Sequence, residues 1–385
     1  MLLFVLVSLS LFIWLFLLLF WGRFWLAQSR IDRRSLAELN SYPSVCVVIP
    51  ARDEAEAIVT SINSLLNQKY RGELSVVLVD DNSRDRTAEL ARKTAKMSDS
   101  SVRFELISGK PLRTGWKGKL WAVKQGVDYA RQNISPDYFL FTDADICHSS
   151  NNIEQLVTKA ETEQLDLVSL MVLLRCKSFW EKLLIPAFVF FFQKLYPFPW
   201  VNNPQRSIAA AAGGCILIRN DTLADIGGIA AIKDALIDDC SLAQAVKARH
   251  KKIWLGLTTT TISLRPYNNL KAIWDTIART AFTQLNYSWL LLVGTLVGMS
   301  LVYLTAPISL TIGIGDRNWL VVGISLLTWL LMSIAYFPTI KLYNLSIFWT
   351  LALPAIAFLY TLMTIDSAVK YYQGKGGAWK GRTYQ

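Results

Sequence analysis

An uncharged apolar run opens the chain. Residues 2–21 contain no Asp, Glu, Lys or Arg, and a helix needs about 20 apolar residues to cross the hydrocarbon core of a bilayer. The pattern therefore predicts a transmembrane anchor over residues 1–21. A signal peptide would have basic residues before its apolar run, whereas here Arg23 and Arg30 follow it. Because basic residues collect on the cytoplasmic side of membranes, we expect an uncleaved anchor, a linker over residues 22–43 and a cytoplasmic domain after it.

From residue 44 the pattern changes to short apolar runs that alternate with helix-like segments. The runs have the composition of strands and cover residues 45–49, 74–79, 102–107 and 138–142. Strands that alternate with helices predict a mainly parallel sheet with right-handed crossovers. The ligand site of such a sheet lies outside the carboxyl ends of its strands. We therefore expect an α/β domain over residues 44–265.

Two apolar segments after the fourth strand have a different character. Residues 179–200 are strongly aromatic, but the stretch between their charged residues is short for a span. We expect an interfacial or re-entrant segment there, and a buried core helix is the alternative. In residues 266–287, Trp274 and other apolar residues recur along one side of a helix, with Lys271 and Asp275 on the other. This amphipathic pattern is typical of a helix on a membrane surface.

Three further apolar runs predict about three transmembrane helices within residues 288–365. With the anchor, they make four spans. Four spans would put the basic tail, residues 366–385, on the opposite side of the membrane from the α/β domain, against the usual distribution of positive charge. Either one run is re-entrant or the tail departs from that rule.

Composition supports a membrane protein. The 385 residues are 52% hydrophobic and include 14 Trp, 14 Tyr and 18 Phe, which exceeds the usual globular share. The net charge of +11 suits anionic partners, but there is no nucleic-acid motif, so we expect membrane and phosphate partners and no nucleic acid. The five cysteines lack metal-site spacing and are expected to be reduced thiols. With two His in the chain, acid–base chemistry must fall to carboxylates.

Carboxylates follow three of the predicted strands. Glu54 comes after the first strand, Asp80 and Asp81 after the second, and Asp143 and Asp145 after the fourth. A lone Asp-X-Asp is often a solvated loop or a helix cap. Parallel strands, however, bring the ends of these three strands to one edge of the sheet. Solvated loops would not require carboxylates from three strands to meet there. Paired carboxylates suit Mg²⁺ or Mn²⁺, which often share their ligands with substrate phosphates. We therefore predict a metal site at Asp145 and Asp143.

Several motifs resemble a known family. Four motifs stand in order at residues 49–54, 79–85, 142–145 and 238–239. They are similar to the motifs of family 2 glycosyltransferases. That family has a GT-A fold, which is a Rossmann-like α/β fold. Four others resemble the hopene-associated glycosyltransferases, which are similar to ceramide glucosyltransferases: residues 115–122, 211–219, 235–243 and 379–384. The resemblance implies a nucleotide-sugar donor, with UDP as the expected nucleotide, and a membrane lipid acceptor, with a hopanoid among the candidates. It also implies a bacterial-type inner membrane.

The expected donor site combines carboxylates, lysines and glycines. Carboxylates at strand ends can accept hydrogen bonds from a base or ribose, although Asp80 also suits a turn. Lys117 and Lys119 lie in a glycine-flanked loop that suits a diphosphate, with solvated lysines as the alternative. Glycines at 213 and 214 allow close approach to the sugar, or form ordinary turns. The predicted nucleotide-sugar site is Ala51, Glu54, Asp80, Asp81, Lys117, Lys119, Asp143, Gly213 and Gly214.

Transfer to an alcohol needs a base. The resemblance assigns this role to Asp239, the second acid of a pair whose first member, commonly Glu, is Asp238 here; a helix N-cap is the alternative. One base without a protein nucleophile implies direct displacement with inversion. Trp274, Arg279 and Phe282 are expected at the acceptor and membrane interface.

The sequence thus favours an inverting, metal-dependent glycosyltransferase that acts on a membrane lipid. A non-catalytic membrane scaffold that retains the nucleotide-binding fold is one alternative. A polysaccharide synthase is another, and Arg279 stands where processive relatives begin the motif Gln/Arg-X-X-Arg-Trp. The chain lacks the last two residues of that motif, which counts against polymer synthesis.

Overall fold

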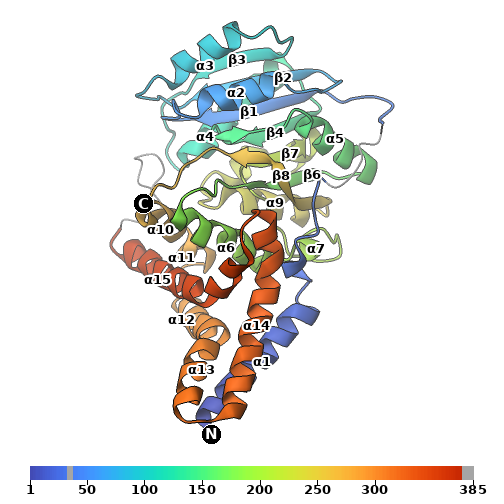
Figure 1. The fold of residues 1–385 in the computed structure, drawn as a ribbon. Coiled ribbons are helices and arrows are strands. Elements are labelled where there is room, and N and C mark those ends of the chain that lie inside the picture. The colour runs from blue at the N-terminus through green and yellow to red at the C-terminus, as the bar shows by residue number, and fades with distance from the viewer. Residues whose placement is uncertain (33–37, 375–385) are drawn as a thin grey trace.

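The computed structural model describes residues 1–32 and 38–374. Most of the predicted basic tail, including the motif at 379–384, lies outside the described residues. The described chain forms an α/β domain above a layer of helices, from which long helices extend away (Figure 1).

A single sheet of eight strands organises the described part of the α/β domain. The strands lie in the order β3-β2-β1-β4-β7-β6-β8-β5. Their bounds are β1 Val45–Ala51, β2 Leu74–Asp80, β3 Arg103–Ser108, β4 Tyr138–Thr142, β5 Ile146–Cys147, β6 Leu167–Leu173, β7 Cys215–Arg219 and β8 Ile253–Ser263. The first four strands, all predicted from the sequence, pair in parallel. The sheet is mixed overall, because β7 runs antiparallel to β4 and β6, and β5 runs antiparallel to β8.

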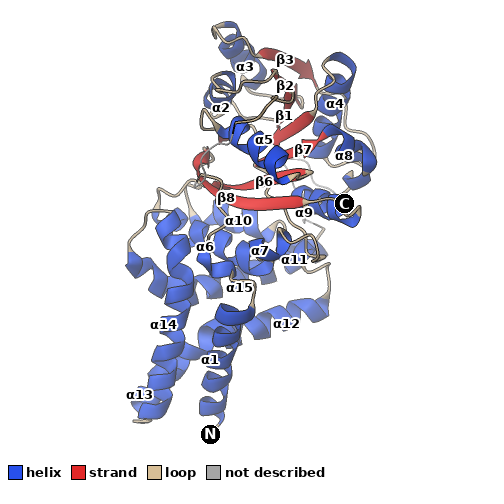
Figure 2. Ribbon diagram, turned by 90° about the vertical axis from the view of Figure 1, so that its right-hand side faces the viewer, coloured by secondary structure: helices blue, strands red, loops and turns tan. Residues whose placement is uncertain are grey.

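Helices cover both faces of this sheet (Figure 2). One hydrophobic core joins the sheet to α2, α3 and α5, and the other joins the opposite face to α4, α8 and α9. The second core continues without a break into the helices below the sheet. The α/β domain and these helices therefore share one apolar interior. The bounds are α2 Ile58–Leu66, α3 Thr87–Lys96, α4 Gly118–Asn133, α5 Asn152–Glu163, α8 Asn220–Asp225 and α9 Asp238–Ala248.

Helices α6 (Phe179–Leu195) and α7 (Phe198–Val201) form the predicted aromatic segment. Ser178 and Glu181 start α6 with a capping box, in which each side chain accepts a hydrogen bond from the other residue's backbone N–H. Much of α6 is buried in the shared core, where it contacts α14 (Trp319–Leu342). The structure thus forms a helix in this segment with one side in the core, and the interfacial placement of the segment remains a prediction.

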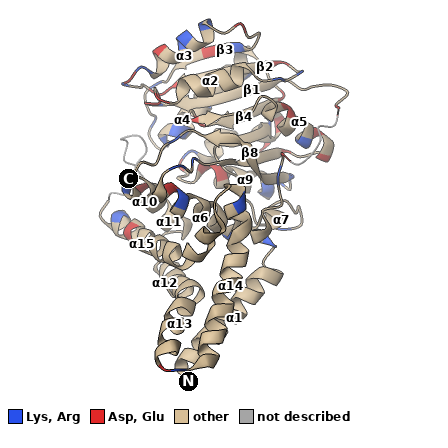
Figure 3. Cartoon of the chain, viewed as in Figure 1, with Lys and Arg blue, Asp and Glu red and all other residues tan. Residues whose placement is uncertain are grey.

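Four helical segments in the described residues are long and apolar enough to cross a membrane: 2–20, 289–315, 319–342 and 347–372. They comprise α1 (Leu2–Phe20), α12 (Trp289–Met299) with α13 (Thr305–Gly315), α14 (Trp319–Leu342) and α15 (Leu353–Tyr372). Helices α1, α13 and α14 run side by side away from the sheet (Figures 1 and 2). Charged residues crowd the sheet domain and are almost absent along these three helices (Figure 3).

Helix α15 takes a different direction and lies across the base of the sheet domain, below α10 and α11 (Figure 1). Near its C-terminal end, Lys370 Nζ lies 2.9 Å from Asp275 Oδ1 of α10. The end of α15 is therefore joined to α10 (Leu270–Ala278).

The amphipathic segment forms two helices, α10 (Leu270–Ala278) and α11 (Ala281–Gln284), where a single helix was expected. The indole Nε1 of Trp274 donates to Asp366 Oδ2 of α15 at 2.7 Å. Residues on the apolar side of α10, including Trp274 and Ile277, pack into the shared core with α6 and α15. This apolar side therefore meets protein, which the periodicity alone could not distinguish from lipid.

Candidate active site

The carboxyl ends of β1, β4 and β8 meet the N-termini of α4 and α9 at a cavity of about 300 Å³. The predicted residues that line it are Glu54, Lys117, Lys119, Asp143, Asp145, Gly213, Gly214, Asp238, Asp239 and Arg279. The convergence of strand-end carboxylates on one place is therefore present in the structure. Among the other predicted residues, Phe282 lines a second cavity, and Ala51, Asp80, Asp81 and Trp274 line neither of these two.

Lys119 joins the carboxylates on two sides of the cavity. Its Nζ lies 2.9 Å from Asp143 Oδ1 and 3.1 Å from Asp238 Oδ2. Burial would lower the pKa of this ammonium, but the two carboxylates outweigh burial and raise the pKa above its usual range. Lys119 is thus a charged group within the cavity and not the solvated lysine of the alternative interpretation.

Asp239 is held by backbone N–H groups. Its Oδ2 accepts from Gly213 N at 2.8 Å and its Oδ1 from Cys240 N at 2.7 Å. Burial, followed by the charge of Asp238, raises the pKa of Asp239 to about 6, against the opposite effect of Lys119. The N-cap of α9 is Ile237, so the capping alternative for Asp239 is wrong. A carboxyl group with this pKa is ionised near neutral pH yet able to accept a proton.

Gly213 allows the backbone to lie close to both Asp239 and Lys119. A Cβ at this position would lie 3.3 Å from Lys119 Nζ and 3.4 Å from Asp239 Oδ2. Its backbone can therefore reach the Asp239 carboxylate without displacing the lysine.

Asp145 and Asp143 fit a divalent cation. Asp145 is 9% exposed and its Oδ2 accepts from Ser263 Oγ at 3.3 Å. Burial, then the charges of Asp143 and Glu54, raise the pKa of Asp145 to about 6. Among the described residues no three His, Cys, Asp or Glu side chains gather closely enough to hold a metal. Two carboxylates that share a Mg²⁺ or Mn²⁺ with substrate phosphates need no third protein ligand of that kind.

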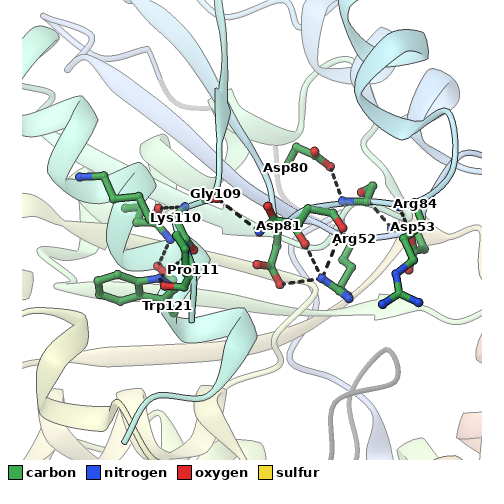
Figure 4. Close-up of polar contacts among 12 residues, drawn as sticks. Arg52, Asp53, Asp80, Asp81, Arg84, Gly109, Lys110, Pro111 and Trp121 are labelled. Atoms are coloured by element: carbon green, nitrogen blue, oxygen red, sulfur yellow. Dashed lines mark hydrogen bonds and ion pairs between the residues drawn. The ribbon is translucent and has the colours of Figure 1, made fainter. Parts of the chain in front are cut away.

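The ends of β1 and β2 form a separate polar cluster beside the cavity (Figure 4). Asp81 is fully buried, its N–H donates to Ala51 O at 2.8 Å, and its carboxylate lies 3.8 Å from Arg52 Nη1. Asp80 Oδ1 accepts from Ser83 N at 3.3 Å, which is the geometry of the turn interpretation. In the described structure these residues fix the strand ends next to Glu54.

Arg265 and Tyr267 also line the cavity, and neither residue was predicted from the sequence. They follow β8, a strand rich in Thr and apolar residues that ends beside Asp145. The sequence contains a signal for them, because they are polar residues directly after a strand. The same pattern predicts Glu54 and Asp143.

A second cavity of about 1270 Å³ opens between α9, α11 and the C-terminal end of α15. It shares Lys117, Ala235, Leu236 and Arg279 with the first. The two cavities are therefore neighbours that meet at these residues.

Comparison with known proteins gives one family match. Residues 46–227 match the model of the glycosyl transferase family 2. This span includes the strand ends at Glu54 and Asp145 and ends before Asp239.

Three curated relatives match parts of the same region. A dolichyl-phosphate beta-glucosyltransferase of Saccharomyces cerevisiae is 32% identical over 35% of this chain and 42% of its own length. An N-acetylglucosaminyltransferase of Rhizobium leguminosarum is 28% identical over 32% of this chain and 26% of its own length. A 4,4'-diaponeurosporenoate glycosyltransferase of Staphylococcus haemolyticus is 29% identical over 31% and 29%. The chain thus spans less than half the length of each of these relatives.

One solved structure resembles nearly the whole chain. It is a mannosyltransferase from Pyrobaculum calidifontis in complex with GDP-Man and Mn²⁺, with a TM-score of 0.54 and 16% sequence identity. The match covers 96% of this chain and 98% of that one. At this identity the likeness concerns the fold, and it includes the helices beyond the α/β domain.

Proposed function

We propose that this chain, whose residues 46–227 match the glycosyl transferase family 2 model, is an inverting, metal-dependent glycosyltransferase that moves a sugar from a nucleotide sugar to a membrane lipid. UDP is the expected nucleotide. The observation that carries the proposal is Asp239, a half-buried carboxylate fixed by two N–H groups. It lines the same cavity as Asp143 and Asp145.

Asp239 serves as the general base. It takes the proton of the acceptor hydroxyl as the acceptor oxygen forms a bond to the anomeric carbon. The bond from that carbon to the diphosphate oxygen breaks, and the nucleoside diphosphate leaves with the bonding electrons. Since attack and departure occur on opposite faces, the configuration inverts.

The cations and carboxylates of the cavity hold the donor. Asp143 and Asp145 would hold Mg²⁺ or Mn²⁺ together with the diphosphate, and the metal supplies Lewis-acid stabilisation of the leaving group. Lys119, already in contact with Asp143, adds positive charge beside the diphosphate. Glu54 and the adjacent Asp81 cluster suit the nucleoside, whose hydroxyl and N–H groups need acceptors.

A membrane location supports a lipid acceptor. In this proposal α1, α13 and α14 cross the membrane, and α15 lies at its surface below the sheet domain. The relatives named for dolichyl-phosphate and 4,4'-diaponeurosporenoate support an acceptor of this kind. A hopanoid is the narrower candidate, on the resemblance to hopene-associated enzymes.

The test is transfer by the purified chain in lipid vesicles. The vesicles contain membrane lipid extract, UDP-sugars and Mn²⁺, and mass spectrometry measures any glycosylated lipid that forms. We expect a hexose-bearing lipid with the wild type and its loss with Asp239→Asn. Nucleotide-sugar binding without transfer or donor hydrolysis would favour the scaffold alternative.

A further inference from the structure

We infer that the second cavity is the acceptor site, and that it takes an amphiphile with an uncharged, hydroxyl-bearing head whose tail leaves beside α11 and the last turns of α15 toward the bilayer. This inference rests on the proposed function for the identity of the reaction. The binding site itself is argued from the cavity and its surroundings.

The inner end of the cavity meets the reacting groups. Cys240 and Ser241, in the first turn of α9, line the second cavity, while the preceding Asp239 lines the first. Arg279 lines both. A hydroxyl group at this junction is therefore next to the Asp239 carboxylate, and the rest of the molecule extends away from the donor.

The outer end of the cavity is an aromatic rim. Tyr287 stacks on Tyr371 with ring centroids 4.4 Å apart, and Trp289 stacks on Tyr372 at 5.4 Å. Trp289 is 58% exposed, and the next residue, Leu290, is 81% exposed at the start of apolar α12. Tyr and Trp are enriched where protein passes from water into lipid. The rim thus lies where an amphiphile can leave the bilayer.

The charges around the cavity favour an uncharged head. Arg279 lines the catalytic cavity as well as the second one, and the catalytic cavity also contains the carboxylates of Asp143 and Asp238. Lys117 has the Asp234 carboxylate as its neighbour. The remaining lining consists of hydroxyl, amide, thiol, aromatic and aliphatic groups. A phosphate head would also be repelled by Asp234, which lines this cavity.

The walls of the cavity are already fixed. Ser367 Oγ of α15 accepts from Phe282 N of α11 at 2.9 Å. Gln284 Nε2 donates to Tyr196 OH of the α6 end at 2.6 Å. These bonds hold three separate elements around one space. The cavity is therefore formed before an acceptor binds.

Photolabelling with a C16 alcohol that carries a diazirine in its tail tests the site. The full-length chain in phosphatidylcholine vesicles is irradiated, and labelled peptides are mapped by mass spectrometry. We expect label on the segments 281–289 and 367–374, and competition by hexadecanol but not by hexadecyl phosphate. Label confined to α1, α13 and α14 would overturn the site, and equal competition by the phosphate would overturn the head-group class.

A pair of variants on α9 provides the matched control. Gln244 and Ala248 are both exposed and lie one turn apart, but of the two Gln244 lines the cavity. We expect Gln244→Trp to lose the label at 281–289 and Ala248→Trp to keep it. Ser207→Trp, which also faces the cavity, and Gln205→Trp, an exposed neighbour outside its lining, repeat the comparison on a loop. Equal labelling within both pairs would contradict the inference.

Donor binding separates the two proposals. UDP-sugar binding with Mn²⁺ and slow hydrolysis of the donor by water are measured on the same variants, and both should match the wild type. If the wild type labels as expected but neither binds nor hydrolyses any nucleotide sugar, the proposed function fails and the amphiphile site stands. If hydrolysis is normal and the cavity does not label, the acceptor inference fails alone.

Discussion

At the residue scale, Asp239 combines burial with two N–H donors, and this combination sets its expected pH dependence. Because burial and Asp238 raise its pKa to about 6, the base is protonated and inactive at lower pH. We expect kcat/KM for transfer to rise with pH, to reach half its plateau near that pKa and then to level off. A pH series from 4.5 to 8.5 at saturating Mn²⁺ measures it, and a flat profile would contradict the assignment.

Replacement of Asp239 tests the same role without a pH change. Asp239→Asn keeps an oxygen that can accept from Gly213 N, so the fold and donor binding should persist. Transfer should fall by about 10²- to 10⁴-fold, the usual contribution of a general base. The control is thermal unfolding, since a large drop in Tm would indicate a structural role instead.

Asp145 lowers the stability of the metal-free folded protein at neutral pH. Its folded-state pKa of about 6 lies above the ordinary value of 3.8, so the folded state binds more protons between these values and stability falls as pH rises through them. Asp145→Asn should therefore raise the unfolding free energy of the metal-free protein at pH 7 by about 1–3 kcal/mol. Its Tm should rise accordingly. The gain should vanish near pH 4, and calorimetry at the two pH values checks it.

The same substitution should remove metal-dependent donor binding. With one carboxylate fewer, the site holds Mn²⁺ weakly against the diphosphate. Asp145→Asn should bind UDP more weakly than the wild type in Mn²⁺ and equally in EDTA, as measured by titration calorimetry. Equal affinity in Mn²⁺ would show that Asp145 is not a metal ligand.

The residues that the sequence predicted are those at the ends of regular strands. Glu54, Asp143 and Asp145 follow apolar runs whose carboxyl ends must meet in a parallel sheet, and they line one cavity. Tyr371 and Ser367 line the second cavity from more than 80 residues beyond α11. Periodicity reports which side of a helix is apolar, but not which distant element will cover it, so this cavity was not predictable.

At the element scale, a polar network joins α10 to α15. Trp274 Nε1 donates to Asp366 Oδ2, and Lys370 Nζ pairs with both Asp366 and Asp275. The sequence predicted that Trp274 would face the membrane surface, whereas this bond turns its polar edge to α15. The periodicity was correct, but its apolar side meets a protein partner that the pattern does not name.

A double-mutant cycle measures this connection. Trp274→Phe removes the donor of this charge-assisted hydrogen bond and Asp366→Ala removes its acceptor, so their effects on unfolding free energy should not add. We expect a coupling of about 1 kcal/mol, a usual value for such a bond. Additive effects would show that this hydrogen bond does not help to hold α10 against α15. The Ile262→Val substitution on β8, which is remote from the bond in the chain, provides a reference for small side-chain changes.

At the scale of the whole molecule, α15 decides the topology. Four spans would leave the chain's end opposite the sheet domain, which the positive charge of residues 366–385 opposes. In the structure α1, α13 and α14 run together, while α15 lies across the base of the sheet domain and Lys370 reaches Asp275 of α10. Three crossings therefore satisfy both the apolar pattern and the charge distribution.

Accessibility of introduced tags tests this topology. A tag placed after residue 385 should lie on the same face of the membrane as the sheet domain, because α15 does not cross in the proposed topology. A tag in the turn at Asp316 and Arg317, between α13 and α14, should lie on the opposite face. Protease protection in sealed, oriented vesicles measures both, with a tag in the α3–β3 loop at Ser98 as the sheet-domain control. Protection of the C-terminal tag together with the Asp316 tag would show that α15 spans the bilayer, and the acceptor cavity would then lose one of its walls.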